Sequence, residues 1–263
     1  MPDAPKAIVF SDLDGTLLDH ETYSWDAAKP ALALMKERGI PLVLASSKTA
    51  AEIAGLRAEM SFADCPAIVE NGAGILEPGG EAAAHGASVH AKLIALLDEM
   101  PLRLRENFSG FSDWSLKKLA TRTGLSLEAA AKAANRCFSE PGLWSGTDEE
   151  RFEFELLLAR KGVTARQGGR YLTLSFGATK ADRMREIAAR YAEGGETPYM
   201  IALGDAPNDI EMLETADRGV IVANPHAAPL PELDGESIGR ITRTEKPGPH
   251  GWNESVLRII EEL

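Results

Sequence analysis

The sequence predicts an α/β fold: a doubly wound, Rossmann-like parallel sheet core with an inserted α+β cap domain. Short apolar runs alternate with amphipathic helical stretches near both ends of the chain, which is typical of parallel sheets. The middle of the chain instead contains two strand-like runs joined by a short glycine turn, which indicates antiparallel pairing. A length of 263 residues suits one large core with a smaller insert. We therefore expect a core of residues 1–84 and 177–263 and a cap of residues 85–176.

Before the expected insert, strands and helices alternate. The strands are continuous apolar runs, as expected when both faces of a strand are buried, and Asp26 and Gly39 can begin and end the first helix. The expected elements are strand 7–10, helix 26–38, strand 41–45, helix 50–59 and strand 67–69. After the last strand, Glu70 to Gly74 forms either a turn with backbone N–H groups open to a ligand or an Asn-Gly hairpin turn.

The insert has a different pattern, and alternation resumes after it. The expected elements of the insert are helices 89–100, 127–136 and 149–160, a looser segment over 107–114, and a hairpin of 163–166 with 171–176. Thr179 can cap the next helix, and Pro207 fits the first turn of another. The elements expected after the insert are helix 179–191, strand 199–203, helix 207–214, strand 220–223 and helix 253–263.

Net charge and composition restrict the class of partner. The chain carries 40 acidic and 28 basic residues, a formal net charge of −12, which argues against nucleic acid or an anionic membrane as partner. The two cysteines, Cys65 and Cys137, lack the spacing of a zinc site or a disulfide framework. With no signal peptide or long apolar span, we expect a cytoplasmic protein that acts on a small molecule. Its oligomeric state is left open.

Four carboxylates follow predicted strands. Asp12 and Asp14 come directly after the first strand, and Asp205 and Asp209 follow a later one. Open α/β sheets gather such groups along one edge. Carboxylates this close repel unless a cation neutralises them or one keeps a proton, and Mg²⁺ suits a few carboxylates together with a phosphate. An EF-hand is excluded, because its twelfth position would be Tyr23 instead of a glutamate.

A hydroxyl and two lysines are expected at the same edge. Ser46 and Lys48 follow the second strand, and Lys180 begins a helix after the insert. A lysine beside carboxylates and a phosphate neutralises charge and holds a covalent intermediate in place. Phosphate monoesters hydrolyse so slowly that enzymes supply up to about 10²¹-fold acceleration, and a metal with covalent catalysis suits such a barrier. These residue types therefore favour phosphoryl-transfer chemistry.

The motifs, in this order, resemble those of a known family, the haloacid dehalogenase superfamily. The matching segments are Asp12-Leu13-Asp14-Gly15-Thr16, Ser46, Lys180 and Gly204-Asp205-x-x-Asn208-Asp209. The insert between the second and third motifs resembles the cap of the sugar-phosphatase branch of this superfamily (Cof-type, C2 cap). The resemblance extends over nearly the whole chain.

This resemblance implies a role for each motif residue. Asp12 would be the nucleophile that forms an aspartyl phosphate, and Asp14 would protonate the leaving oxygen and then activate water. Ser46 and Lys180 would hold the phosphoryl group. The implied cofactor is Mg²⁺, and its implied ligands are Asp12, the Asp14 backbone carbonyl, Asp205 and, directly or indirectly, Asp209.

Finer features resemble mannosyl-3-phosphoglycerate phosphatases, which release phosphate to leave mannosylglycerate, a compatible solute. These features are Ser46-Ser47-Lys48-Thr49, Arg136-Cys137-Phe138-Ser139-Glu140-Pro141, Gly168-Gly169-Arg170-Tyr171 and Pro249-His250-Gly251-Trp252-Asn253. Lys48, Arg136 and Arg170 would meet anionic groups of the substrate. Ser139 and Glu140 would meet sugar hydroxyls. The further expected substrate contacts are Asn71, Gly72 and Asn208.

The expected function is a Mg²⁺-dependent phosphatase that acts on mannosyl-3-phosphoglycerate. Glucosyl-3-phosphoglycerate or another sugar phosphate, such as a sucrose-type phosphate, is the nearest alternative substrate. A phosphomannomutase-like phosphotransferase would use the same nucleophile but pass the phosphoryl group to another sugar hydroxyl. A non-catalytic sugar-phosphate sensor is a third alternative, against which the pair Asp12 and Asp14 argues. We also expect the cap to move so as to admit substrate and exclude water.

Overall fold

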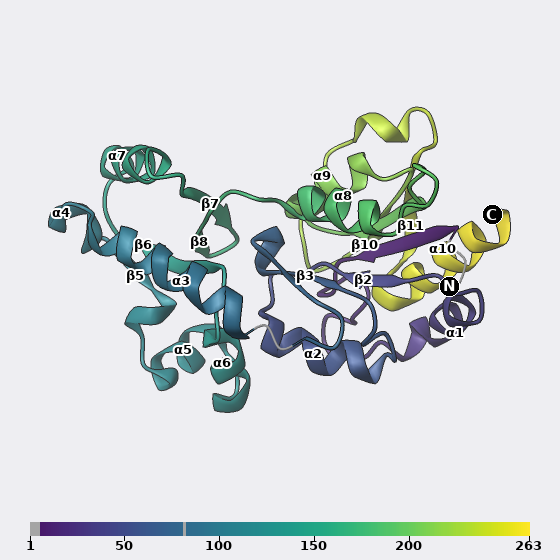
Figure 1. Cartoon of the computed structure of the whole chain (residues 1–263), viewed down its shortest axis with the longest axis horizontal. Coiled ribbons are helices and arrows are strands. Elements are labelled where there is room, and N and C mark those ends of the chain that lie inside the picture. The colour runs from purple at the N-terminus through teal and green to yellow at the C-terminus, as the bar shows by residue number, and fades with distance from the viewer. Residues whose placement is uncertain (1–5, 81–82) are drawn as a thin grey trace.

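The chain is divided into two lobes, which Figure 1 shows side by side. The computed structural model describes residues 6–80 and 83–263, with side chains given from residue 88 onward in the second range. The strand β1 and the C-terminal helix α10 lie on the lobe drawn at the right in Figure 1, and the segment from α3 to β8 forms the lobe at the left. The expectation that no signal peptide precedes the core concerns mainly residues 1–5, which lie outside the described residues. Among the described helices, none combines the length and apolar composition needed to cross a bilayer.

The core lobe is built on a five-stranded parallel sheet. Its strand order is β11-β10-β9-β1-β2, and every neighbouring pair runs parallel. The strands are β1 Ala7–Ser11, β2 Leu42–Leu44, β9 Tyr199–Gly204, β10 Arg218–Ala223 and β11 Ile241–Pro247. Because β1 lies inside the sheet and connections run in both directions from it, the doubly wound prediction is confirmed.

Helices cover both faces of this sheet, which explains the continuous apolar strands. Ala7 and Val9 pack in one hydrophobic cluster with residues of α1, α2 and α10. Ile8 and Phe10 point the other way, into a cluster with residues of α8 and α9, since successive strand residues face opposite sides. The helices are α1 Lys29–Glu37, α2 Ala50–Glu59, α8 Lys180–Arg190, α9 Ile210–Thr215 and α10 Gly248–Glu262.

The third predicted strand forms a hairpin instead of a full member of the sheet. β3 (Ala67–Val69) pairs antiparallel with β4 (Gly74–Leu76), and an isolated parallel bridge joins Ala45 to Ile68. The connecting turn is the short 3₁₀ segment η2 (Glu70–Gly72). The hairpin is therefore observed, and the contact of this turn with a ligand stays a prediction.

The cap is an α+β unit around a four-stranded antiparallel sheet with strand order β5-β6-β8-β7. Residues of α3 and α7 pack on one face of this sheet, and α5 and α6 pack beside it (Figure 1). The elements are α3 Ala83–Asp98, α4 Leu102–Arg105, β5 Phe108–Gly110, α5 Leu116–Thr123, α6 Leu127–Ala134, β6 Ser139–Trp144, α7 Asp148–Ala159, β7 Thr164–Gly168 and β8 Tyr171–Ser175. The expected boundary at 84/85 falls inside the first turn of α3, and that at 176/177 follows β8 directly.

Several sequence predictions need correction. The segment 107–114, expected to be irregular, contains β5, and β6 and β11 were not predicted. β11 is mostly polar with an exposed side, as an edge strand can be, so it lacks the apolar run that marks the buried strands. The helix expected over 127–136 ends at Ala134. The C-terminal helix begins at Gly248, five residues before the expected 253, because Pro249 is tolerated in a first helical turn.

Candidate active site

The carboxyl edge of the core sheet brings distant segments together. Asp12 follows β1, Ser46 follows β2 and Asp205 follows β9, and these three strands lie next to one another in the order β9-β1-β2. The backbone N–H of Asp12 donates to the carbonyl of Leu203 at 2.9 Å. Asp12 and Asp205 therefore share one end of adjacent parallel strands, where open α/β sheets bind ligands.

Three buried carboxylates meet at this edge around one lysine. Asp12, Asp205 and Asp209 each offer an oxygen within 4.8 Å of the others. Lys180 Nζ donates to Asp12 Oδ1 at 2.6 Å and to Asp209 Oδ1 at 2.7 Å, and its side chain is only 1% exposed. The lysine begins α8, whose capping box is made by Thr179. One ammonium group thus ties the helix after the insert to both carboxylates.

Burial dominates the electrostatics of this cluster. It raises the pKa of Asp12 well above its usual value, and the charges of Asp209 and Asp205 raise it too, against the opposing effect of Lys180. Burial likewise raises the pKa of Asp205. Burial alone would lower the pKa of Lys180, but the two carboxylates it contacts raise it. The lysine therefore stays protonated, beside Asp12 and Asp205, whose ionised forms burial disfavours unless a further cation is bound.

Asp205 is held by two side chains to which the sequence analysis gave no role. Thr16 Oγ1 donates to Asp205 Oδ1 at 2.5 Å, and Asn224 Nδ2 donates to Asp205 Oδ2 at 2.8 Å. Gly15 has a φ of +81°, and a Cβ there would lie 2.4 Å from Asn224 Nδ2. Asn224 directly follows β10 at the same sheet edge, so the rule that found Asp12 would also have found it.

Asp209 is already fully engaged by the protein. Its Oδ1 accepts from Lys180, and its Oδ2 accepts the backbone N–H groups of Asp205 and Ala206 at 3.1 Å each. By comparison, each oxygen of Asp205 accepts one side-chain hydrogen bond, and Asp12 accepts from Lys180 through Oδ1. The donor set of three neighbouring carboxylate oxygens fits a hard divalent cation, with Asp12 and Asp205 as the residues that would hold it and Asp209 fixing their surroundings.

Asp14 lies apart from the three clustered carboxylates. Lys48 Nζ donates to both of its carboxylate oxygens, at 2.8 and 2.7 Å. Burial alone would lower the pKa of Lys48, but the adjacent Asp14 raises it, so the ion pair is retained. Lys48, which was expected to bind substrate, is thus paired with Asp14, the residue expected to act as acid and base.

The remaining core residues of the predicted site lie close to one another. Ser46 is buried, and its Oγ accepts the backbone N–H of Lys48 at 3.2 Å. Asn71 Oδ1 accepts from Asn208 Nδ2 at 3.0 Å, which joins the 70–72 turn to the loop after β9. Gly72 has a φ of +91°, and a Cβ there would lie 2.1 Å from the carbonyl carbon of Thr179. Gly72 therefore permits a close backbone approach to the start of α8.

The candidate cap residues are engaged by protein partners. Arg136 Nη2 donates to Ser139 Oγ at 2.7 Å. Glu140 accepts from Ser112 and lies 2.8 Å from His90 Nε2, inside the cap. The fourth candidate lies in the β7–β8 turn, where Arg170 donates to the carbonyl of Arg122 at 3.1 Å. In this conformation, each of these side chains is therefore bound by neighbouring protein groups.

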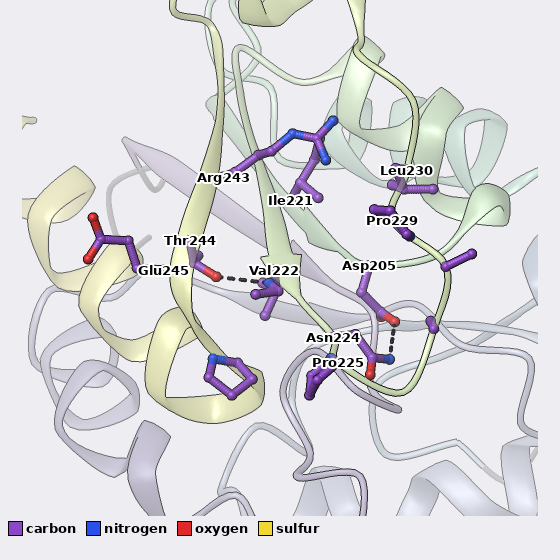
Figure 2. Close-up of a pocket in the computed structure, with 14 residues that line it drawn as sticks. Asp205, Ile221, Val222, Asn224, Pro225, Pro229, Leu230, Arg243, Thr244 and Glu245 are labelled. Atoms are coloured by element: carbon purple, nitrogen blue, oxygen red, sulfur yellow. Dashed lines mark hydrogen bonds between the residues drawn. The ribbon is translucent and has the colours of Figure 1, made fainter.

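A cavity of about 440 Å³ has Asp205 in its lining (Figure 2). It is bounded by β10, β11 and the loop of residues 224–230, and its lining is mostly apolar. Asp205 and Asn224 stand at its edge, joined by their hydrogen bond. Its lining includes Asp205 but neither Asp12 nor Lys180.

This fold and site define a class of protein. Residues 9–100 and 149–229 match the family model of the haloacid dehalogenase-like hydrolases, and the chain belongs to this family. The membership confirms the resemblance predicted from the motifs and the prediction of a hydrolase. The α/β core with its extra antiparallel sheet is the fold of the family's solved structures as well.

Among named proteins, the chain is similar to the glucosyl-3-phosphoglycerate/mannosyl-3-phosphoglycerate phosphatase of Persephonella marina (strain DSM 14350 / EX-H1). The two are 31% identical over 272 residues, which cover 97% of this chain and 98% of the relative. This relative supports the class of phosphoric monoester hydrolases.

Two solved structures share the fold. BT1666 of Bacteroides thetaiotaomicron, described among phosphatases of the superfamily, has a TM-score of 0.67 at 20% identity over 100% of this chain and 97% of its own. The sucrose-phosphatase of Synechocystis sp. PCC6803, solved with sucrose and phosphate, has a TM-score of 0.61 at 16% identity over 97% and 98%.

Proposed function

We propose that this protein is a Mg²⁺-dependent phosphatase that converts mannosyl-3-phosphoglycerate to mannosylglycerate and phosphate through an aspartyl phosphate. The observation that carries the proposal is the bridge from Lys180 to Asp12 and Asp209 within a buried carboxylate cluster. The name of the Persephonella marina relative supports the substrate. Mg²⁺, when bound by Asp12 and Asp205, would neutralise negative charge on the carboxylates and the phosphoryl group.

The residues of the chain can carry both half-reactions. Asp12 Oδ1 is held by Lys180, which leaves Oδ2 to attack phosphorus. As that bond forms, the bond from phosphorus to the ester oxygen breaks, and Asp14 in its protonated form gives this oxygen a proton. Asp14, now a carboxylate, takes a proton from water, which attacks phosphorus and releases Asp12. Ser46 and Lys180 hold the phosphoryl oxygens in both steps.

The substrate also carries a carboxylate, which needs a cation that is already at the site. Lys48 meets this need: its ammonium group lies 2.7 Å from Asp14, and its side chain is 20% exposed. A substrate carboxylate that approached Lys48 would compete with Asp14 for the same charge and would free Asp14 for its role as acid. A sugar phosphate without a carboxylate would not do so.

A panel of phosphate esters tests the proposal. With Mg²⁺, mannosyl-3-phosphoglycerate is expected to release phosphate with a higher kcat/KM than glucose 6-phosphate or sucrose 6-phosphate. A preference for simple hexose phosphates would contradict the substrate assignment, and an isomerised sugar phosphate without free phosphate would indicate a mutase. Binding without turnover of any ester would indicate a sensor.

Glucosyl-3-phosphoglycerate is the second candidate substrate. It is favoured by a specific observation, namely that the name of the Persephonella marina relative includes both sugars. Both esters share the phosphoglycerate group that Lys48 would recognise. The same panel separates them by kcat/KM. We further propose a small-molecule substrate in the cytoplasm, in keeping with a net charge of −12.

A further inference from the structure

One core carboxylate, that of Glu70, collects hydrogen bonds from the cap. Glu70 is 1% exposed. Its Oε1 accepts the backbone N–H of Cys137 at 2.8 Å, and its Oε2 accepts the N–H of Phe138 at 3.1 Å and the hydroxyl of Ser139 at 2.7 Å. The Nε of Arg136 lies 3.3 Å from the same Oε2 and supplies the countercharge. One buried side chain of the core thus holds four consecutive residues of the cap.

Packing next to Glu70 secures the same four residues. A Cβ on Gly74 would lie 2.2 Å from the ring of Phe138, so the ring rests directly on the backbone of β4. Arg136 also donates to the carbonyl of Ser47 at 3.3 Å. The cap segment 136–139 is therefore attached both to the β3–β4 hairpin and to the loop after β2.

On its other side, the turn that carries Glu70 contacts three loops of the candidate active site. The N–H groups of Glu70 and Asn71 donate to the carbonyls of Lys48 and Ser46, at 3.0 and 2.9 Å. Asn71 also accepts from Asn208, in the loop after β9. Gly72 lies against the start of α8, where Lys180 begins the helix.

The backbone of this turn is strained. Glu70, Asn71 and Gly72 have successive φ values of 53°, 58° and 91°, a conformation that a glutamate rarely adopts. Such strain persists only where the surroundings fix it, and it gathers at functional sites. A turn that served only to reverse the chain would not need a buried glutamate at a positive φ.

We infer that Glu70 is a positioning residue that fixes the cap to the phosphate-binding loops of the core. Arg136 and Ser139 then act through Glu70 and are not themselves ligands of the sugar. The cap surface is held at a set position relative to Ser46 and Lys48. A leaving group long enough to touch both lobes depends on this position, whereas a small aryl phosphate bound by the core alone does not.

The inference rests on the proposed function for its choice of sugar substrate, and it is tested by Glu70→Gln. The amide keeps the size of the side chain but loses the charge and one acceptor oxygen. We expect kcat/KM for mannosyl-3-phosphoglycerate to fall about 10- to 100-fold, mainly through KM, while kcat/KM for p-nitrophenyl phosphate changes by less than about twofold. Small-angle scattering should show a wider spread of lobe separations, which a purely local role would not produce.

Two further variants control this experiment. Glu236→Gln removes a carboxylate in another part of the core that also accepts from an arginine and a backbone N–H. It should leave kcat/KM for both substrates unchanged. Ser139→Ala is a milder change at the same junction, and it replaces Glu70→Gln in the experiment if that variant does not fold. It should also lower kcat/KM for mannosyl-3-phosphoglycerate.

Two results would overturn the inference: equal losses for both substrates, or an unchanged rate with the sugar substrate in both junction variants. Failure of the proposed function looks different, because the unmodified protein would then hydrolyse p-nitrophenyl phosphate but not mannosyl-3-phosphoglycerate. In that case, kcat/KM of the junction variants is compared between p-nitrophenyl phosphate and the best sugar phosphate of the panel. The same two results would then overturn the role of Glu70.

Discussion

Replacing Lys180 with methionine would remove the positive charge that lies between Asp12 and Asp209. The lysine is 1% exposed and contacts the carboxylates at 2.6 and 2.7 Å. Breaking a buried pair from one side costs about 3–5 kcal/mol, because a charge is left uncompensated. For a domain of this size that corresponds to a fall in Tm of roughly 6–20 °C. Activity should be lost as well, because Asp12 is no longer held.

The loss of stability in Lys180→Met depends on pH in a defined direction. The pKa of Asp12 is already raised by burial, and it must rise further without Lys180. A carboxyl group with a raised pKa in the folded state stabilises the fold at low pH and loses that contribution as pH rises. Lys180→Met should therefore be least destabilised in acid, where Asp12 is protonated, and most destabilised near neutral pH.

Thermal unfolding in chelator, followed by circular dichroism, measures the effect. Arg185→Met is the matched control, because Arg185 lies on the same helix in an exposed pair with Asp182, 58% and 52% exposed, and such pairs contribute about 0–1 kcal/mol. If Lys180→Met were no less stable than Arg185→Met, the cluster would not have the electrostatics described above.

Three further predictions follow from the same site. Gly15→Ala should raise the Mg²⁺ concentration that gives half the maximal rate, because the added Cβ would displace Asn224 from Asp205. The control is Gly39→Ala, since Gly39 has a similar positive φ but open space around it. An equal effect of both variants would refute the reasoning. Stabilisation of the unmodified protein by Mg²⁺ should shrink as pH falls, because burial raises the pKa values of Asp12 and Asp205 and their protonation prevents metal binding; a Tm increase that is independent of pH would contradict this. Lys48→Met should lower kcat/KM more for mannosyl-3-phosphoglycerate than for glucose 6-phosphate, with partial recovery in Lys48→Arg, and equal losses would count against recognition of the carboxylate.

The sequence was sufficient to predict the parts of the fold that are buried on both faces. The runs at Ala7–Ser11 and Tyr199–Gly204 are apolar because helices cover both sides of the sheet, so their pattern is clear. β6 and β11 were missed because β6 includes Glu140 and Pro141, which match no strand pattern, and β11 has an exposed polar face. Their pairing is set by tertiary contacts that no local window contains.

The candidate site was predictable where one rule applied, namely that the residues after parallel strands meet at one edge. This rule correctly grouped Asp12 and Asp205, whereas Lys180 follows the antiparallel cap strand β8 and reaches the cluster from the start of α8. It did not predict that Lys48 pairs with Asp14, because that depends on side-chain direction. Nor did it give Glu70 a role, since a turn glutamate looks solvent-exposed until the cap that covers it is known.

The central claim is that Asp12 accepts the phosphoryl group. The most direct measurement is mass spectrometry of the peptide that contains Asp12 after acid quench of a single turnover with mannosyl-3-phosphoglycerate or p-nitrophenyl phosphate. We expect Asp12 to be phosphorylated in the unmodified protein. We expect Asp12→Asn to show neither phosphorylation of this peptide nor Mg²⁺-dependent turnover. Undiminished phosphate release by Asp12→Asn would contradict it.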